Sequence, residues 1–439
     1  MRTATALVVG ETIAVGIFLT PAGMVKSLGS PALVLLVWLV MGAATLCGAL
    51  CYGELAARFP EAGGGYVYLR EAYGRPVAFL YGWMALLVMD PGITAALAVG
   101  LATYAGYGLG LGGAAVKLVA VVAIVVVATV NVRGVRLGAR LVRWLTALKL
   151  GLLLLIPLWG FGMRLGDWSH FAPFFAQREG SAPLFGALAG GLVAAFFSFG
   201  GWWDLSKLAG ELRDPERTLP RALVFGVIVV TLVYVLTSAV FVYLVPPGQV
   251  TSGETFAAQA GEALFGRTGG VVFSGVVVVA VLGSLAGVLM AAPRVYFAMA
   301  RDRLFLPAAA AVHPRFGTPA RAVALQAALA SLLVVLGNFD EIVSYFIFVV
   351  LIFIALTAAA VYVLRRVPAG GDVYRTPGYP VTPAVFLLLI TVLLVLLGGA
   401  SPRRSLLGAA VVAAGLPVYY LFVRGREAGG KFEEGESEA

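Results

Sequence analysis

The chain has 439 residues, of which 61% are hydrophobic and 12% are charged, and its formal net charge is +9 at pH 7. Soluble domains carry about 25% charged residues, so this composition excludes an ordinary soluble protein and indicates an integral membrane protein. No polar stretch is long enough for a separate soluble domain, and residues 1–423 are expected to form one transmembrane domain. Residues 424–439 are charged and glycine-rich, and they are expected to form a disordered tail.

About twelve apolar segments are long enough to cross a membrane, since a spanning helix needs about 20 mostly apolar residues. In chain order they lie near 4–25, 31–57, 76–109, 114–132, 139–163, 184–212, 221–245, 269–300, 320–338, 341–365, 382–400 and 404–423. The sequence therefore predicts an all-α, multi-pass membrane protein in contact with the lipid bilayer. The glycine-rich segment Pro60–Tyr68, between the second and third spans, is expected to form a cytoplasmic turn.

Basic residues are divided unequally between the two sides of this arrangement. With the amino terminus inside, 23 of the 31 lysines and arginines lie on the cytoplasmic side and 7 lie outside, and Lys149 lies within a span. Cytoplasmic loops carry an excess of such residues, so both termini are predicted to be cytoplasmic, and no nucleic-acid partner is needed to explain the net charge. Lys207, counted on the cytoplasmic side, is expected to form an ion pair with Asp204 near that interface.

The cysteines and histidines form no pattern typical of a metal or catalytic site. Cys47 and Cys51 alone supply too few ligands for zinc. His170 and His313 are isolated residues outside the predicted spans. We therefore expect no metal, no cofactor and no catalytic residues, and the protein is not expected to be an enzyme.

Two of the predicted spans contain an interruption. The first lies within Gly10–Phe18, and the second lies within Phe196–Asp204, which contains the adjacent residues Gly200 and Gly201. Two such glycines cost about 2 kcal/mol of helix propensity relative to alanine. Interrupted helices in corresponding positions of two halves are typical of the central binding site of a secondary transporter. The alternative is that these glycines only allow helices to pack closely.

Several motifs resemble the amino acid–polyamine–organocation (APC) superfamily, and most of all the L-type amino-acid transporters and their bacterial relatives. The motifs are Gly10–Phe18, Pro60–Tyr68, Phe197–Trp202, Gly210–Arg217, and Ala300–Asp302 followed by Leu306-Pro307 and Thr318-Pro319. The resemblance implies a five-plus-five inverted repeat with broken first and sixth helices. Repeat one would cover about 4–163, repeat two about 184–365, and two extra helices about 382–423.

The resemblance also implies a function. It implies a secondary active transporter that moves amino acids, above all neutral L-amino acids, across the cytoplasmic membrane by alternating access. Exchange and proton symport both remain open, so protons are a second candidate partner. The alternative within the same fold is a carrier of cationic amino acids or polyamines.

The sequence departs from these relatives in two places. Ala14-Val15 stands where relatives commonly have Gly-Ser, so the first helix is expected to be less fully unwound. Relatives that bond a heavy chain carry an outer cysteine between the third and fourth spans, and the segment 107–115 has none. We therefore expect no disulfide-linked heavy chain.

Helix ends of opposite polarity at the two breaks suit the two charged groups of an amino acid. Free N–H groups at the start of a half-helix attract a carboxylate, and freed carbonyls at the end of another attract an ammonium group. The resemblance implies the same roles, and it implies that Phe197 is the gate that closes the site from outside. Thr12 is an expected substrate-binding residue, and the expected amide donors are those of Val15, Gly16 and Ile17. The expected carbonyl acceptors are those of Phe197, Ser198 and Gly200.

Side chains that select the substrate are expected on the third, sixth, eighth and tenth spans. The candidates are Asp90, Ile93, Phe199, Gly283 and Tyr345.

Lys149 lies well inside the fifth predicted span. A charged lysine there costs on the order of 3 kcal/mol on insertion scales, so it is expected to be partnered or functional. The resemblance implies a cation or a lysine at this point, so the Lys149 ammonium is expected to contact the carbonyls of Gly10 and Ile13 and the hydroxyl of Ser284. Its role is either to brace the fold or to couple transport to protons.

Two carboxyls also lie within predicted spans. Glu11 is expected to pair with Lys149, to exchange a proton itself, or to face cytoplasmic water. Asp90 is expected to contact a cationic substrate side chain or to pair with a basic neighbour.

Overall fold

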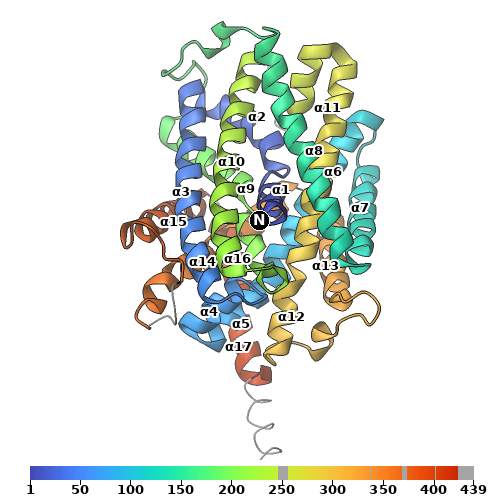
Figure 1. Cartoon of the computed structure of the whole chain (residues 1–439). Helices are drawn as coiled ribbons and strands as arrows, with labels where there is room; N and C mark the ends of the chain where they lie inside the picture. Colours follow the sequence, from blue (N-terminus) through green and yellow to red (C-terminus); the bar gives the residue numbers. More distant parts are fainter. Residues whose placement is uncertain (246–255, 338, 368–372, 401, 424–439) are drawn as a thin grey trace, which may run out of the picture.

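Helices that run alongside one another make up most of the chain (Figure 1). The computed structural model describes residues 1–245, 256–337, 339–367, 373–400 and 402–423, and no strand occurs among them. The α-helices are α1 (Arg2–Thr12), α2 (Gly16–Leu28), α3 (Pro31–Arg58), α4 (Gly65–Tyr73), α5 (Arg75–Met84), α6 (Asp90–Leu109), α7 (Ala114–Val132), α8 (Val135–Gly162), α9 (Leu184–Phe199), α10 (Pro215–Leu244), α11 (Phe256–Ala291), α12 (Pro293–Arg301), α13 (Ala320–Leu336), α14 (Phe339–Leu364), α15 (Val381–Ala400), α16 (Pro402–Ala413) and α17 (Gly415–Val418). Two other helices shape the interior, the π-helix η1 (Ala85–Met89) and the 3-10 helix η3 (Trp202–Glu211).

The fold class predicted from the sequence is confirmed. Nine helices among the described residues are long and apolar enough to cross a membrane, and the bent pair α1 and α2 makes a tenth span. Shorter apolar helices, Ala320–Leu336 and Ser405–Leu421, lie at the positions of the two remaining predicted spans. The boundaries of the two repeats stay a prediction, and the tail at 424–439 lies outside the described residues.

Three segments differ from their predicted form. The predicted turn Pro60–Tyr68 ends early, because α4 begins at Gly65 and buries its first residues against the bundle. The third span contains the π-helix η1, which directly precedes Asp90-Pro91; proline has no N–H for the regular ladder, so the turn before it widens. The eighth span is one candidate span, Phe265–Arg301, but it is divided into α11, which ends at Ala291, and α12, which begins at Pro293, because proline lacks the N–H of the regular ladder.

The first interruption separates α1 from α2, which lie near the centre of the bundle in Figure 1. α1 ends at Thr12, α2 begins at Gly16, and the two helix axes differ by 42°. Ala14-Val15 therefore does not keep this helix continuous, although the break contains a single glycine. α1 packs against α8, α10, α11 and η3, so its end is enclosed by protein on several sides.

The second interruption lies between α9 and η3. Gly201 has φ 98° and ψ −15°, a conformation that residues with a side chain rarely adopt. The segment that follows it is a 3-10 helix and not the α-helical half that the sequence suggested. A Cβ on Gly201 would lie 3.1 Å from the carbonyl carbon and oxygen of Glu11, so the second break packs directly on the end of α1.

We expect Gly201→Ala to destabilise the protein by about 1–3 kcal/mol, because alanine strains the backbone at this φ and crowds Glu11. Thermal unfolding in detergent measures the effect as a lower melting temperature. Gly190→Ala in α9 is the matched control, since no atom lies within 4 Å of the Cβ that it adds. The control should leave the melting temperature unchanged or raise it. Equal shifts for both variants would show that the break does not depend on glycine.

Candidate functional site

The two interruptions touch each other through Gly16 and Ser198. A Cβ on Gly16 would lie 2.6 Å from the Ser198 Cα, so only glycine fits at this contact. Thr20 Oγ1 lies 2.9 Å from Ser198 Oγ and also donates to the Gly16 carbonyl at 2.9 Å. The close packing that the sequence left open as an alternative is therefore present, and it joins α2 to α9.

Within the described part of the chain, three N–H groups at the start of α2 have no backbone acceptor. The N–H of Phe18 donates to the Val15 carbonyl at 3.1 Å. Among the described residues, the N–H groups of Val15, Gly16 and Ile17 donate no backbone hydrogen bond. Free N–H groups at the positive end of a helix attract anions. The amides that the sequence predicted as donors therefore have no backbone acceptor in the described part of the chain. Val15 and Ile17 are fully buried, so these amides are closed off from solvent in this conformation.

Tyr234, on α10, joins the carbonyls at the ends of α1 and α9. Its hydroxyl lies 2.7 Å from the Thr12 carbonyl oxygen and 2.7 Å from that of Ser198. A hydroxyl has one hydrogen, so it donates to one of these carbonyls at a time. The Phe197 carbonyl accepts the N–H of Gly200 at 3.1 Å. Two of the three predicted acceptors, Phe197 and Ser198, are therefore already in contact with a donor.

Nothing in the sequence singled out Tyr234. One tyrosine in an apolar span cannot be told from a packing residue, because its partners lie 222 and 36 residues away along the chain.

Lys149 is fully buried on α8, and its ammonium contacts the end of α1. Its Nζ lies 2.8 Å from the Gly10 carbonyl oxygen and 2.8 Å from Ser284 Oγ, and it also donates to the Ile13 carbonyl. These are the three contacts that the sequence predicted. Because Ser284 is on α11, the lysine links α8, α1 and α11.

A second buried lysine, Lys207, lies between two carboxylates. Its Nζ is 2.8 Å from Asp204 Oδ1 and 3.1 Å from Asp90 Oδ1. The Tyr296 hydroxyl donates to Asp90 Oδ2 at 2.7 Å. The predicted Asp204–Lys207 pair is confirmed, and the Lys207 side chain is only 1% exposed within the protein. Its place near the cytoplasmic interface stays a prediction. Of the two alternatives for Asp90, the structure has the pair with a basic neighbour.

Two of the three alternatives predicted for Glu11, an ion pair with Lys149 and contact with water, are not found. Glu11 is 3% exposed, so it does not face water. No ion pair joins it to Lys149, and neither carboxyl oxygen has a hydrogen-bond donor among the described residues. The start of η3 packs on the Glu11 backbone through Gly201, and Asp204 follows three residues later.

Two predicted specificity residues occupy packing positions. The Phe199 ring is buried, with its centroid 5.1 Å from that of Tyr234. Gly283 faces α8, where a Cβ would lie 2.9 Å from Leu145 Cβ. Both therefore serve contacts between helices in this conformation.

The remaining predicted residues are less tightly enclosed or outside the described part. Phe197 and Ile93 are partly buried and pack against the apolar core. The side chain of Tyr345 lies outside the described residues.

Residues 1–422 match the amino acid permease family. The chain belongs to this family. The permease is 33% identical over 428 residues to the serine/threonine exchanger SteT of Bacillus subtilis, an alignment that covers 95% of this chain and 94% of the relative. The resemblance to the APC superfamily is confirmed.

Animal relatives are similar over most of their length. The permease is 30% identical over 437 residues to the large neutral amino acids transporter small subunit 2 of Homo sapiens, with 96% of this chain and 79% of the relative covered. It is 29% identical over 364 residues to the b(0,+)-type amino acid transporter 1 of Oryctolagus cuniculus, with 82% and 74% covered.

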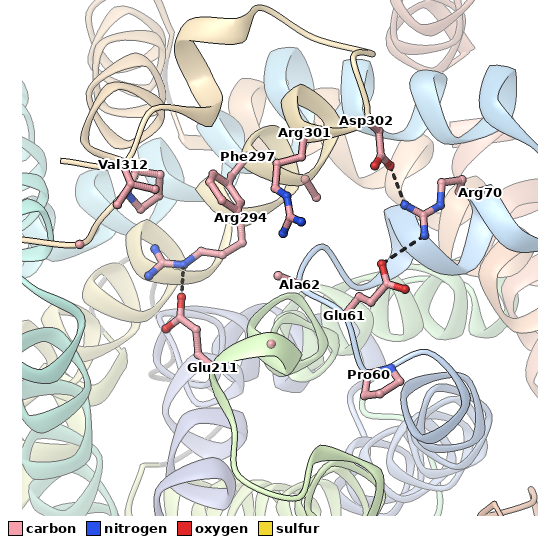
Figure 2. A pocket seen from close by; sticks show the side chains of 14 residues that line it. Pro60, Glu61, Ala62, Arg70, Glu211, Arg294, Phe297, Arg301, Asp302 and Val312 are labelled. Atoms are coloured by element: carbon pink, nitrogen blue, oxygen red, sulfur yellow. Dashed lines mark hydrogen bonds and ion pairs between the residues drawn. The ribbon is translucent and has the colours of Figure 1, made fainter. Parts of the chain in front are cut away.

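One end of the permease, where α4 and α12 lie, contains a pocket of about 480 Å³ (Figure 2). Arg294, which is buried, donates from Nε to Glu211 Oε1 at 2.9 Å across this pocket. The charged residues that line it are Glu61, Arg70, Glu211, Arg294, Arg301 and Asp302.

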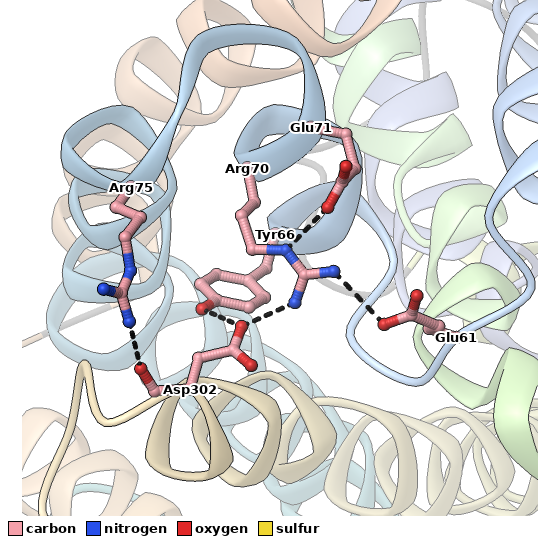
Figure 3. Close-up of polar contacts among 6 residues, drawn as sticks. All are labelled: Glu61, Tyr66, Arg70, Glu71, Arg75 and Asp302. Carbon is pink, nitrogen blue, oxygen red and sulfur yellow. Dashed lines mark hydrogen bonds and ion pairs between the residues drawn. The ribbon is translucent and has the colours of Figure 1, made fainter. Parts of the chain in front are cut away.

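Arg70 is the centre of an ion-pair network beside this pocket (Figure 3). Its guanidinium lies 2.6 Å from Asp302, 2.9 Å from Glu71 and 3.2 Å from Glu61. Tyr66 also donates to Asp302, at 2.6 Å. Burial alone lowers the pKa of Arg70, but its hydrogen bonds to these carboxylates raise that pKa above the ordinary value. The network ties α4 to the end of α12.

We expect Arg70→Gln to destabilise the permease by about 1–3 kcal/mol, because Asp302 loses its charged partner. A lower melting temperature in detergent measures the loss. Arg301→Gln is the matched control, since Arg301 lines the same pocket but among the described residues contacts the Phe297 ring and no carboxylate. The control should change stability by less than about 0.5 kcal/mol. Equal effects would mean that the network does not hold α4 against α12.

Proposed function

We propose that this permease moves amino acids, above all neutral L-amino acids, across the cell membrane by alternating access, as an exchanger or a proton symporter. The observation that carries the proposal is the contact between two broken helices, one with unpaired N–H groups and the other with carbonyls at its end. The names of its relatives support the choice of substrate, since they include a serine/threonine exchanger and a large neutral amino acids transporter.

The backbone recognises the substrate in this proposal. The carboxylate binds the amides of Val15, Gly16 and Ile17 at the start of α2. The ammonium group binds carbonyls at the end of α9, those of Ser198 and Gly200. The Tyr234 hydroxyl, which has one hydrogen, contacts the Ser198 carbonyl in this structure. A substrate ammonium group, which has three hydrogens, would replace that hydroxyl as the donor.

Substrate entry requires the two broken helices to separate. Gly16 lies against Ser198, and this contact leaves no room for an amino acid between them. Alternating access then consists of opening this contact toward one side of the membrane or the other. We place the end that carries the Arg70 network on the cytoplasmic side, because most basic residues of the loops lie there.

Lys149 has two candidate roles within this function. As a charged side chain it braces α8 against α1 and α11. As a proton-exchanging group it would hold the Gly10 and Ile13 carbonyls when protonated and release them when neutral. A cationic or polyamine substrate is less well supported, because Asp90 already pairs with Lys207.

The first functional prediction concerns the two charged groups of the substrate. We expect uptake of L-leucine or L-serine into proteoliposomes to be inhibited by the parent amino acid, and not by its amide or its decarboxylated amine. Each analogue lacks the carboxylate that the α2 amides bind. An amine that competes as well as the parent would contradict the carboxylate site and favour a polyamine-type carrier.

The second prediction concerns Phe197 as the gate. We expect Phe197→Ala to slow transport by at least about tenfold while it weakens equilibrium binding much less, because a gate sequesters the substrate without making its polar contacts. Uptake rates and binding to detergent-solubilised protein provide the comparison. Phe185→Ala, also on α9 and 78% exposed, is the control and should change neither quantity. Equal losses of transport and binding for Phe197→Ala would make it an ordinary wall of the pocket.

A further inference from the structure

We propose that Glu11 and Asp204 share a proton, and that this carboxyl pair is the group through which a proton gradient drives the permease. The inference rests on the proposed function as a transporter, and it assigns the coupling to carboxyls in place of Lys149.

The surroundings of Glu11 require a neutral or shared carboxyl. The side chain is 3% exposed, and neither oxygen receives a donor among the described residues. An isolated carboxylate in a dry interior is strongly disfavoured, and it takes up a proton instead. Asp204 lies three residues after Gly201, which packs on the Glu11 backbone, so the two carboxyls belong to elements in direct contact. Two carboxylates cannot hydrogen-bond each other unless one of them is protonated.

The helices packed against α1 contribute the charged and hydroxyl groups of this region. α8 contributes a lysine, α11 a hydroxyl, α10 a tyrosine, and η3 both members of an ion pair that reaches α6. These groups are Lys149, Ser284, Tyr234, Asp204, Lys207 and Asp90.

Charge balance within this set leaves room for one proton. The ammonium of Lys149 is directed to carbonyls and a hydroxyl, and that of Lys207 to Asp90 and Asp204. Three buried carboxyls, including Glu11, therefore face two ammonium groups. One further proton makes the cluster neutral, which is the favoured state in a low dielectric.

The position of the pair explains how its proton would bias transport. Glu11 lies in α1 and Asp204 in η3, so the pair spans the two broken helices. The bound proton allows a hydrogen bond between them and keeps the helices together. When the cytoplasmic end opens and water reaches the pair, the proton leaves and two carboxylates repel each other. The two open states of the permease thus bind the proton with different affinities, which coupling requires.

Uptake into proteoliposomes tests the transport side of this inference. L-Serine and L-leucine are the probes, with the outside either acidic or at the pH of the lumen. We expect acid outside to increase wild-type uptake. The ratio of uptake with acid outside to uptake at equal pH should fall to about 1 in Glu11→Gln and in Asp204→Asn. Glu262→Gln is the control, since Glu262 is an exposed carboxyl and should leave the ratio as in wild type. Lys149→Ala should lower stability but keep the ratio in its residual uptake.

Infrared spectroscopy of the purified permease tests the shared proton without transport. We expect the carboxylic-acid C=O band of wild type at neutral pH to be absent from Glu11→Gln and from Asp204→Asn. If neither probe is transported by wild type, the proposed function is wrong, and this band still decides whether the pair holds a proton.

Three outcomes overturn the inference. One is an infrared difference spectrum without the carboxylic-acid band. Another is a ratio that disappears in Lys149→Ala and persists in Glu11→Gln, which would assign coupling to the lysine. The third is wild-type uptake that ignores the pH gradient and stops when sodium is replaced by choline.

Discussion

Backbone groups released inside the membrane are the constraint on which the rest of this structure depends. Lipid offers them no hydrogen bonds, so protein must supply the partners. The carbonyls at the end of α1 accept hydrogen bonds from Lys149, Ser284 and Tyr234, which come from three different helices. Among the described residues the amides at the start of α2 have no backbone partner, and in the proposed function they bind the substrate carboxylate.

Charged side chains of the interior also need partners that the protein supplies. A chain with 12% charged residues nevertheless buries Asp90, Asp204 and Lys207 together, and each ion pair joins one helix to another or one turn to the next. Removing one member of such a set would leave an uncompensated charge in the interior, which is far more costly than losing a surface pair. These residues therefore restrict how the broken helices can move.

The short helix η3 connects the centre of the permease to its charged end. Gly201 directly before its start packs on Glu11, and Glu211 at its end pairs with Arg294 in the charged pocket. A displacement of η3 therefore changes contacts at both places at once. Its 3-10 form follows from Gly201, whose positive φ turns the chain away from the axis of α9. The glycine pair at the second break thus positions the inner network as well as the central site.

The sequence by itself determined the membrane class, the approximate spans and the two interruptions, because composition, helix length and glycine placement are local properties. The three contacts of Lys149 span 135 to 139 residues, and they were expected from the resemblance to the APC superfamily. The sequence did not determine which charges meet. Lys207 reaches Asp90 across 117 residues, and Arg70 reaches Asp302 across 232, and such pairs depend on how each helix is rotated and packed. For the same reason Gly283 and Phe199 were predicted in the pocket and lie in helix contacts. Only the tertiary structure decided these positions, since a one-residue change in helix register turns a side chain by about 100°.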